Sequence, residues 1–201
     1  MRDCDHPVTI TTNSERVCRD VDILADMAGR NLAAVMISVT TLDPRLARLM
    51  EPRAATPARR IAAIRRLSAV GVPVWISLSP MIPAINDHDI ETIVAAGAQA
   101  GARGACSIPV RLPHEVAPLF RDWLATHFPD RAARVMHHIS EMRGGKDNDP
   151  NFFTRFQGHG PYAALMRKRF NLACISHGLS QERIMLDTTR FRPPKDQMTL
   201  F

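Results

Sequence analysis

The chain has 201 residues with 45% hydrophobic and 23% charged side chains, and its 26 basic and 20 acidic residues give a formal net charge of +6. These totals are typical of one soluble globular domain that is large enough to bury its own core. No apolar run approaches the roughly 20 residues that a membrane span requires, and the first five residues contain no apolar segment of a secretory signal. The sequence therefore predicts a cytoplasmic protein with no membrane partner.

Arginine dominates the basic residues, because only Lys146, Lys168 and Lys195 are lysines. Arginine is suited to bidentate contact with phosphate, so nucleic acid is an allowed partner. A solvated surface in an arginine-biased genome explains the same excess. Charge balance concerns solubility and non-specific binding rather than fold, and it leaves both interpretations open.

Four short apolar runs predict β-strands, and amphipathic segments between and after them predict α-helices. The predicted strands, in chain order, are 8–12, 33–39, 72–78 and 104–110. The predicted helices are 16–29, 57–71, 86–101, 113–128, 131–143 and 161–177. The helix at 57–71 has clear end signals, since Thr56 and Pro57 are typical of a helix start and Gly71 is typical of a helix end.

Strands that alternate with helices predict parallel pairing with right-handed crossovers. The fold class expected is α/β, with a partial parallel (β/α) barrel followed by C-terminal helices. Residues 1–128 are expected to form the barrel part, and residues 129–201 a helical extension with an extended tail. Polar, proline-rich loops follow the predicted strands, at the sheet edge where parallel α/β proteins place their chemistry.

Five stretches of sequence, taken in order, carry a family resemblance. They are SVTTLDP at 38–44, MEPRAATPARRIAAI at 50–64, SPMIPAIND at 79–87, RGGKDNDP at 143–150 and GHGPY at 158–162. Together they resemble the radical SAM superfamily, and most closely its branch related to spore photoproduct lyase, which is also described as DNA-repair-photolyase-like. The resemblance extends over essentially the whole chain.

The resemblance implies an incomplete (β/α) barrel, S-adenosylmethionine (SAM) as a cofactor and a [4Fe–4S] cluster. In the family, a C-x-x-x-C-x-x-C loop after the first strand holds the cluster, because three thiolates leave one iron open for SAM. This sequence has no such loop, and its cysteines Cys4, Cys18, Cys106 and Cys174 are scattered. We therefore expect no metal ligands in this chain. The chain is expected to correspond to the C-terminal half to two-thirds of a family member, with a separate N-terminal half as a partner.

The resemblance also implies a set of SAM-binding positions. They are Ser38, Glu51, Arg60, Asn86 and Arg111. Each has a structural alternative: a satisfied strand-end hydroxyl for Ser38, a salt bridge at the helix start for Glu51 and Arg60, and a helix N-cap for Asn86. Arg111 is expected either to meet a substrate phosphate or the SAM carboxylate, or to cap the sheet end.

Asn13 stands in the segment TTNS at 11–14, where relatives in the family carry threonine-lysine-serine. The substitution removes a cation that would pair with the SAM carboxylate. The chain ends in QMTLF, which resembles the bacterial sliding-clamp-binding peptide. In that interpretation Leu200 and Phe201 bury in a pocket while Gln197 is a polar anchor. The alternative is a tail that packs on its own domain.

Three functions follow from these observations. The first is SAM- and iron-sulfur-dependent radical chemistry, directed at nucleic-acid repair or modification, once the N-terminal part is supplied. The second is a non-catalytic remnant, and the third is a module that binds DNA or a sliding clamp. Because the cluster loop is absent from this sequence, whether the isolated chain is an enzyme stays open at this level.

Overall fold

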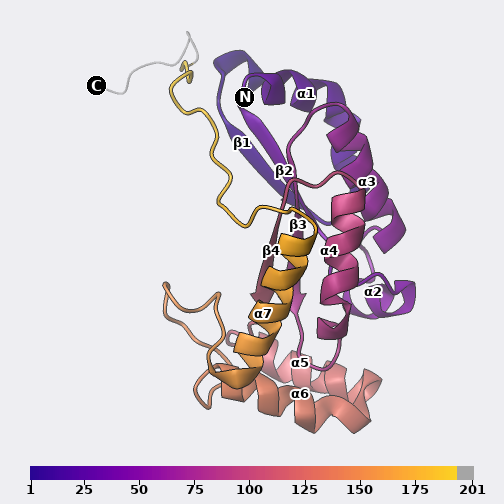
Figure 1. The fold of residues 1–201 in the computed structure, drawn as a ribbon. Helices are drawn as coiled ribbons and strands as arrows, with labels where there is room; N and C mark the ends of the chain where they lie inside the picture. The colour runs from indigo at the N-terminus through magenta and orange to yellow at the C-terminus, as the bar shows by residue number, and fades with distance from the viewer. Residues whose placement is uncertain (194–201) are drawn as a thin grey trace.

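A computed structural model describes residues 1–193, which contain one four-stranded parallel sheet in the order β1-β2-β3-β4 (Figure 1). The strands are β1 (Val8–Thr12), β2 (Ala33–Ser38), β3 (Val74–Met81) and β4 (Gly104–Pro109). All three neighbouring pairs are parallel, with Val8 opposite Ala33 in the first. The predicted α/β class with parallel strands is confirmed.

Ten helices, counting three short 3₁₀ segments, complete the described part of the chain. They are η1 (Arg2–Cys4), η2 (Glu15–Asp20), α1 (Val21–Gly29), α2 (Pro44–Met50), α3 (Pro57–Ala69), η3 (Asp87–Asp89), α4 (Ile90–Gln99), α5 (Val116–His127), α6 (Pro129–Met142) and α7 (Gly160–Ser176). The positive φ angle of +85° at Gly71 lets the chain turn directly from α3 toward β3.

Several boundaries differ from the sequence-based expectation, and one helix was not expected. Strand β3 ends at Met81 instead of residue 78, and α5 starts at Val116 instead of residue 113. The predicted helix 16–29 is divided into η2 and α1, and Ser14 caps the start of η2 by accepting from the Arg16 amide at 3.2 Å. Strand β3 starts at Val74 instead of residue 72, since the Val72 amide is used to close α3 by donating to the Leu67 carbonyl. Helix α2 was not predicted, although Asp43 and Pro44 are typical of a helix start and the Asp43 carboxylate accepts from the Arg45 amide at 2.8 Å.

Helices α1, α3, α4 and α7 lie together on one face of the sheet (Figure 1). The strand residues that face them are fully buried, among them Val35, Ile37, Val74 and Ile76. The opposite face is only partly covered. It carries half-buried side chains such as Met36, Trp75 and Cys106, which line a hollow with residues 181–184.

A second hydrophobic cluster lies under α5 and α6, at the edge where the strands end (Figure 1). Its buried side chains include Ile82 and Val110 from the strand ends, Leu124 from α5, and Val135 and Ile139 from α6. The cluster therefore draws residues from both sides of residue 128 and attaches the helical hairpin to the carboxyl-terminal edge of the sheet.

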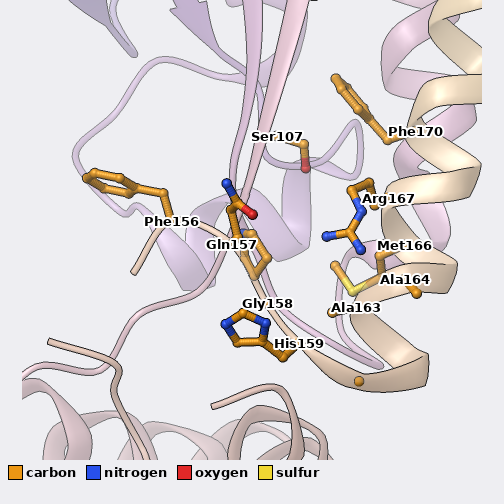
Figure 2. Close-up of a pocket in the computed structure, with 12 residues that line it drawn as sticks. Ser107, Phe156, Gln157, Gly158, His159, Ala163, Ala164, Met166, Arg167 and Phe170 are labelled. Atoms are coloured by element: carbon orange, nitrogen blue, oxygen red, sulfur yellow. The ribbon is translucent and has the colours of Figure 1, made fainter. Parts of the chain in front are cut away.

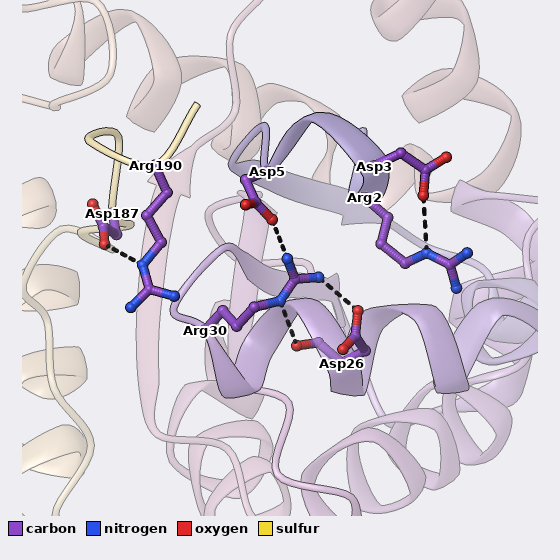
Figure 3. A network of polar contacts seen from close by, with 7 residues as sticks. All are labelled: Arg2, Asp3, Asp5, Asp26, Arg30, Asp187 and Arg190. Atoms are coloured by element: carbon purple, nitrogen blue, oxygen red, sulfur yellow. Dashed lines mark hydrogen bonds and ion pairs between the residues drawn. The ribbon is translucent and has the colours of Figure 1, made fainter. Parts of the chain in front are cut away.

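After α7 the chain runs back in an extended path to its own N-terminal segment (Figure 1). The Asp187 amide donates to the Asn31 carbonyl at 2.9 Å, and Arg30 pairs with both Asp5 and Asp26 (Figure 3). No helix of the described chain is both long and apolar enough to cross a bilayer. The clamp-like positions Gln197, Leu200 and Phe201 lie outside the described residues.

Candidate functional site

A single carboxylate, that of Glu51, joins the ends of two strands and a helix. Its Oε1 accepts from Asn13 Nδ2 at 3.1 Å, just after β1. Its Oε2 accepts from Thr40 Oγ1 at 3.0 Å, just after β2, and from Arg60 Nη1 at 2.8 Å, on α3. This arrangement holds a negative charge at the carboxyl-terminal edge of the sheet, where parallel α/β proteins bind their ligands.

The guanidinium of Arg60 is almost completely buried, with 2% of its side chain exposed, against 21% for Glu51. Besides the carboxylate, it donates from Nε to the Ala55 carbonyl at 2.8 Å and from Nη1 to the Ser38 carbonyl at 3.1 Å. Its Nη2 has no acceptor among the described residues. Arg60 thus neutralises the Glu51 carboxylate and fixes its orientation. The Nη2 group of Arg60 remains available as a donor.

Asn86 is completely buried, and its side chain connects the end of β3 to the loop after β2 by hydrogen bonds. Its Nδ2 donates to the Thr40 carbonyl at 2.8 Å and to the Pro80 carbonyl at 3.0 Å, while its Oδ1 accepts from the Ile82 amide at 2.6 Å. Although Asn86 precedes η3, its side chain makes no capping hydrogen bond, so the N-cap interpretation is wrong. The side chain positions the loop after β3.

An apolar pocket of 570 Å³ opens beside Glu51, between the ends of β3 and β4 and helix α5. Its walls include Met50, Pro52, Ile82, Leu112, Val116, Phe120 and Trp123. The charged side chains that line it are Glu51 and Arg111. A pocket of this volume with few polar groups has the character of a small-molecule site.

The structure brings most of the predicted positions together. Ser38, Glu51 and Arg60 share one network, Asn86 joins it through the Thr40 carbonyl, and Arg111 lines the same pocket as Glu51. The contribution of Thr40 was missed. Its signal was available, because a polar residue directly after a buried strand points to this edge of the sheet.

The described cysteines do not form a donor set for an iron-sulfur cluster. Cys4 lies in η1, Cys18 in η2, Cys106 in β4 and Cys174 in α7. Within residues 1–193, no three histidine, cysteine or acidic side chains are grouped so that they would hold a metal ion. Burial raises the pKa of the Cys174 thiol to about 11, which opposes the thiolate form that ligation requires. These residues do not fit the cluster that the family resemblance implies.

Tyr162, the single tyrosine of the chain, ties α7 to η3. Its hydroxyl donates to Asp87 Oδ2 at 2.5 Å. The ring of His138 stacks on the Tyr162 ring, with the two ring centroids 4.0 Å apart. Burial, followed by the hydrogen bond to Asp87, raises the pKa of Tyr162 to about 12. The protonated phenol therefore supports the loop that follows β3.

This environment predicts that phenolate absorbance of the folded protein will appear with a midpoint near pH 12, against about 10 for the urea-unfolded chain. Because the folded state holds the proton more tightly, the stabilisation is complete below about pH 10 and is lost as the pH rises through the folded pKa. Circular dichroism at each pH will confirm that the fold persists. We expect Asp87→Asn to lower the midpoint, and a folded wild-type midpoint near 10 would contradict the assignment.

A second hollow, of 660 Å³, lies between β4, the loop before α7 and α7 itself (Figure 2). Arg167 extends from α7 toward Gln157, and His159 faces the same space (Figure 2). Ser107 contributes a hydroxyl from β4. This hollow is more polar than the pocket beside Glu51, and the two share no lining residue.

The fold and this edge define a parallel α/β protein with an apolar pocket at the carboxyl ends of its strands. Residues 2–96 match the family model described as the Radical SAM superfamily. The matched segment contains β1, β2 and β3 and four of the five candidate positions. Arg111 lies beyond it.

Several curated proteins are similar to this chain. The uncharacterized protein Rv2578c of Mycobacterium tuberculosis (strain ATCC 25618 / H37Rv) is 28% identical over 130 residues, which cover 64% of this chain and 38% of that protein. The uncharacterized protein Mb2609c of Mycobacterium bovis has the same identity and coverage. The uncharacterized protein ORF301 of Acidianus two-tailed virus is 31% identical over 74 residues, 37% of this chain and 24% of that protein. The chain therefore spans little more than a third of the mycobacterial relatives it matches.

Proposed function

We propose that this chain is the C-terminal portion of a radical SAM (β/α) barrel and that its carboxyl-terminal sheet edge binds the adenosyl part of SAM. The observation that carries the proposal is the pocket beside Glu51. Its apolar walls suit a planar base, the Glu51 carboxylate accepts hydrogen bonds from ribose hydroxyls, and the Arg111 guanidinium matches the carboxylate of SAM. The match of residues 2–96 to the superfamily supports the same assignment.

Ser38, Arg60 and Asn86 serve as positioning residues in this proposal. Arg60 orients the Glu51 carboxylate, and Asn86 holds the loops that form the pocket wall. When bound, SAM would supply an adenosyl radical after one-electron reduction by a cluster. Because the described thiols do not fit such a cluster, its ligands belong in this proposal to a separate N-terminal portion.

The pocket predicts binding of SAM that a single bulky side chain will block. Val116, at the start of α5, lines the pocket and is 43% exposed, so Val116→Trp should fill it without disturbing the core. Leu119, on the same helix and 66% exposed, does not line it, and Leu119→Trp is the matched control. By isothermal titration calorimetry we expect SAM and S-adenosylhomocysteine to bind the wild type and the control, and to lose binding to Val116→Trp. Equal heats for all three proteins would overturn the assignment.

A second measurement tests the source of the cluster. We expect the genomic DNA before the Met1 codon to encode a C-x-x-x-C-x-x-C loop, in the same or an adjoining frame. A stable four-iron cluster formed by anaerobic reconstitution of this chain alone would contradict the division of the site between two portions.

We propose nucleic acid as the class of substrate, in the manner of a repair or modification enzyme, and the excess of arginine supports this choice. The sliding clamp is a proposed further partner through the terminal residues. A peptide of residues 190–201 is expected to compete with a known clamp ligand, and its failure to compete would remove the clamp from the proposal.

A further inference from the structure

Two arginines and two phenylalanines stack alternately beside the end of β4. The Arg111 guanidinium lies over the Phe156 ring, with its carbon 5.0 Å from the ring centroid. The Arg155 guanidinium lies 4.8 Å from the same ring and 4.7 Å from the ring of Phe152. We call these four residues the Arg–Phe ladder.

Neither guanidinium of the Arg–Phe ladder is neutralised. Among residues 1–193, Arg111 and Arg155 form no ion pair with a carboxylate, and the Nε atom of each is buried without an acceptor. Two carboxylates that precede Phe152 in the sequence have other partners, since Asp147 pairs with Arg121 at 2.8 Å and Asp149 accepts from Thr154 at 2.5 Å. Buried donors are usually hydrogen-bonded in folded proteins, so each of these Nε atoms is available to an acceptor such as water or a phosphate oxygen.

A third arginine fixes the loop that carries the Arg–Phe ladder. Arg143, only 4% exposed, donates from Nη1 to the Gln157 carbonyl at 2.6 Å and from Nη2 to the Val110 carbonyl at 3.1 Å. Its Nε is also buried without an acceptor. A buried guanidinium therefore holds the backbone of residues 155–157 against the end of β4.

Three phenylalanine rings between residues 152 and 156 are largely exposed to solvent. Phe152 is 65% exposed, Phe153 84% and Phe156 43%. Phe156 also borders the 660 Å³ hollow, across which Arg167 lies, while His159 lies between them (Figure 2). Cations and exposed rings therefore continue from the Arg–Phe ladder into this hollow, across the end of β4.

We propose that the Arg–Phe ladder and the adjoining hollow bind single-stranded nucleic acid. Alternating cations and rings match the alternation of phosphates and bases in an unpaired strand, because guanidinium groups contact phosphate and every base has a face that stacks on an aromatic ring. Arg111 belongs both to the ladder and to the pocket beside Glu51, which places a bound strand next to the proposed SAM site. The role of the bound strand as a substrate next to SAM rests on the proposed function, whereas binding of the strand to the Arg–Phe ladder does not.

Fluorescence anisotropy with a labelled oligothymidylate of about 12 nucleotides, within the usual range of site sizes, tests the proposal on the whole chain without SAM or iron. We expect Phe152→Leu to weaken binding roughly 5- to 100-fold, since stacking on one ring accounts for this range, and Phe152 is 65% exposed with a single guanidinium over its ring. We expect Arg155→Gln to lower the slope of log Kd against log salt by about 0.7, the value for one phosphate contact on a single strand. Arg65→Gln, on the exposed surface of α3, makes the same charge change and should leave both quantities nearly unchanged.

The competitors identify the ligand. Unlabelled oligothymidylate should displace the probe, whereas thymidine monophosphate, inorganic phosphate, polyglutamate and duplex DNA should do so only at much higher concentrations. Equal competition by phosphate or polyglutamate would reduce the surface to a general anion site and overturn the proposal, as would preference for the mononucleotide or the duplex. If Phe152→Leu and Arg155→Gln bind like Arg65→Gln, the ladder is not the contact. Calorimetry with SAM is independent of all these outcomes, so failure of the ladder and failure of the SAM site are distinguishable.

Discussion

Replacing Glu51 by leucine is expected to lower the free energy of unfolding by about 3–5 kcal/mol, which is the usual result of removing one partner of a buried ion pair. The reason is that the Arg60 guanidinium, with 2% of its side chain exposed, would keep its charge in an apolar setting with only carbonyl acceptors. Urea unfolding of the wild type and Glu51→Leu, followed by circular dichroism, measures the difference.

The same helix offers a matched control. Arg59 pairs with Glu15 at 2.9 Å, but 70% and 36% of their side chains are exposed. Because exposed pairs contribute about 0–1 kcal/mol, Glu15→Leu should have little effect. The double variant Glu51→Leu, Arg60→Met should be less destabilised than the sum of the single variants, since it removes the unpaired charge. A loss below about 1 kcal/mol for Glu51→Leu, similar to the expected loss for Glu15→Leu, would show that the network does not organise this edge.

Asn86→Ala is expected to destabilise the protein by about 3–5 kcal/mol as well, because each buried polar group left without a partner costs about 1–3 kcal/mol. The substitution leaves the Ile82 amide and the carbonyls of Thr40 and Pro80 without the contacts that Asn86 makes. Urea unfolding gives the total, and native-state hydrogen exchange at the Ile82 amide reports the local effect.

Asn13→Ala is the control for this second substitution. Asn13 makes one exposed hydrogen bond to Glu51, at 3.1 Å, so its loss should cost well under the value for Asn86→Ala. If the Ile82 amide in Asn86→Ala exchanges as slowly as in the wild type, the loop after β3 does not depend on Asn86, and the positioning role is wrong.

Periodicity and end signals predicted most of the fold. The strand runs 8–12, 33–39 and 104–110 differ from β1, β2 and β4 by at most one residue, because strands buried between neighbours are continuous apolar runs. The missed element, α2, is only seven residues long, too short for a helical period to be visible. The break between η2 and α1 depends on the packing of Cys18 against α3, where its thiol lies 3.9 Å from the Ala63 carbonyl.

The candidate site was predictable in its members but not in its connections. The position of Ser38 at the end of a strand and of Arg111 after the last strand follows from the rule that parallel strands direct their loops to one edge. Thr40 and Asn13 have a role because both donate to the Glu51 carboxylate. The direction of that side chain depends on the position of α2 and of the loop that follows it. Glu51 and Arg60 were expected to pair in both interpretations, as a buried pair near the SAM ribose or as a structural salt bridge, and the structure shows the pair.

The sequence alone determined the α/β class, the parallel order of the strands, the loop edge that carries polar residues and the resemblance to the radical SAM superfamily. These properties are local, because they depend on the spacing of apolar residues and on short motifs. Only the tertiary structure decided that Glu51 joins β1, β2 and α3, that Asn86 clips two loops instead of capping a helix, and that the Arg–Phe ladder forms between residues 111 and 156. Such contacts join residues up to 46 positions apart in the site itself, and the folding of the sheet and the packing of the helices bring them together.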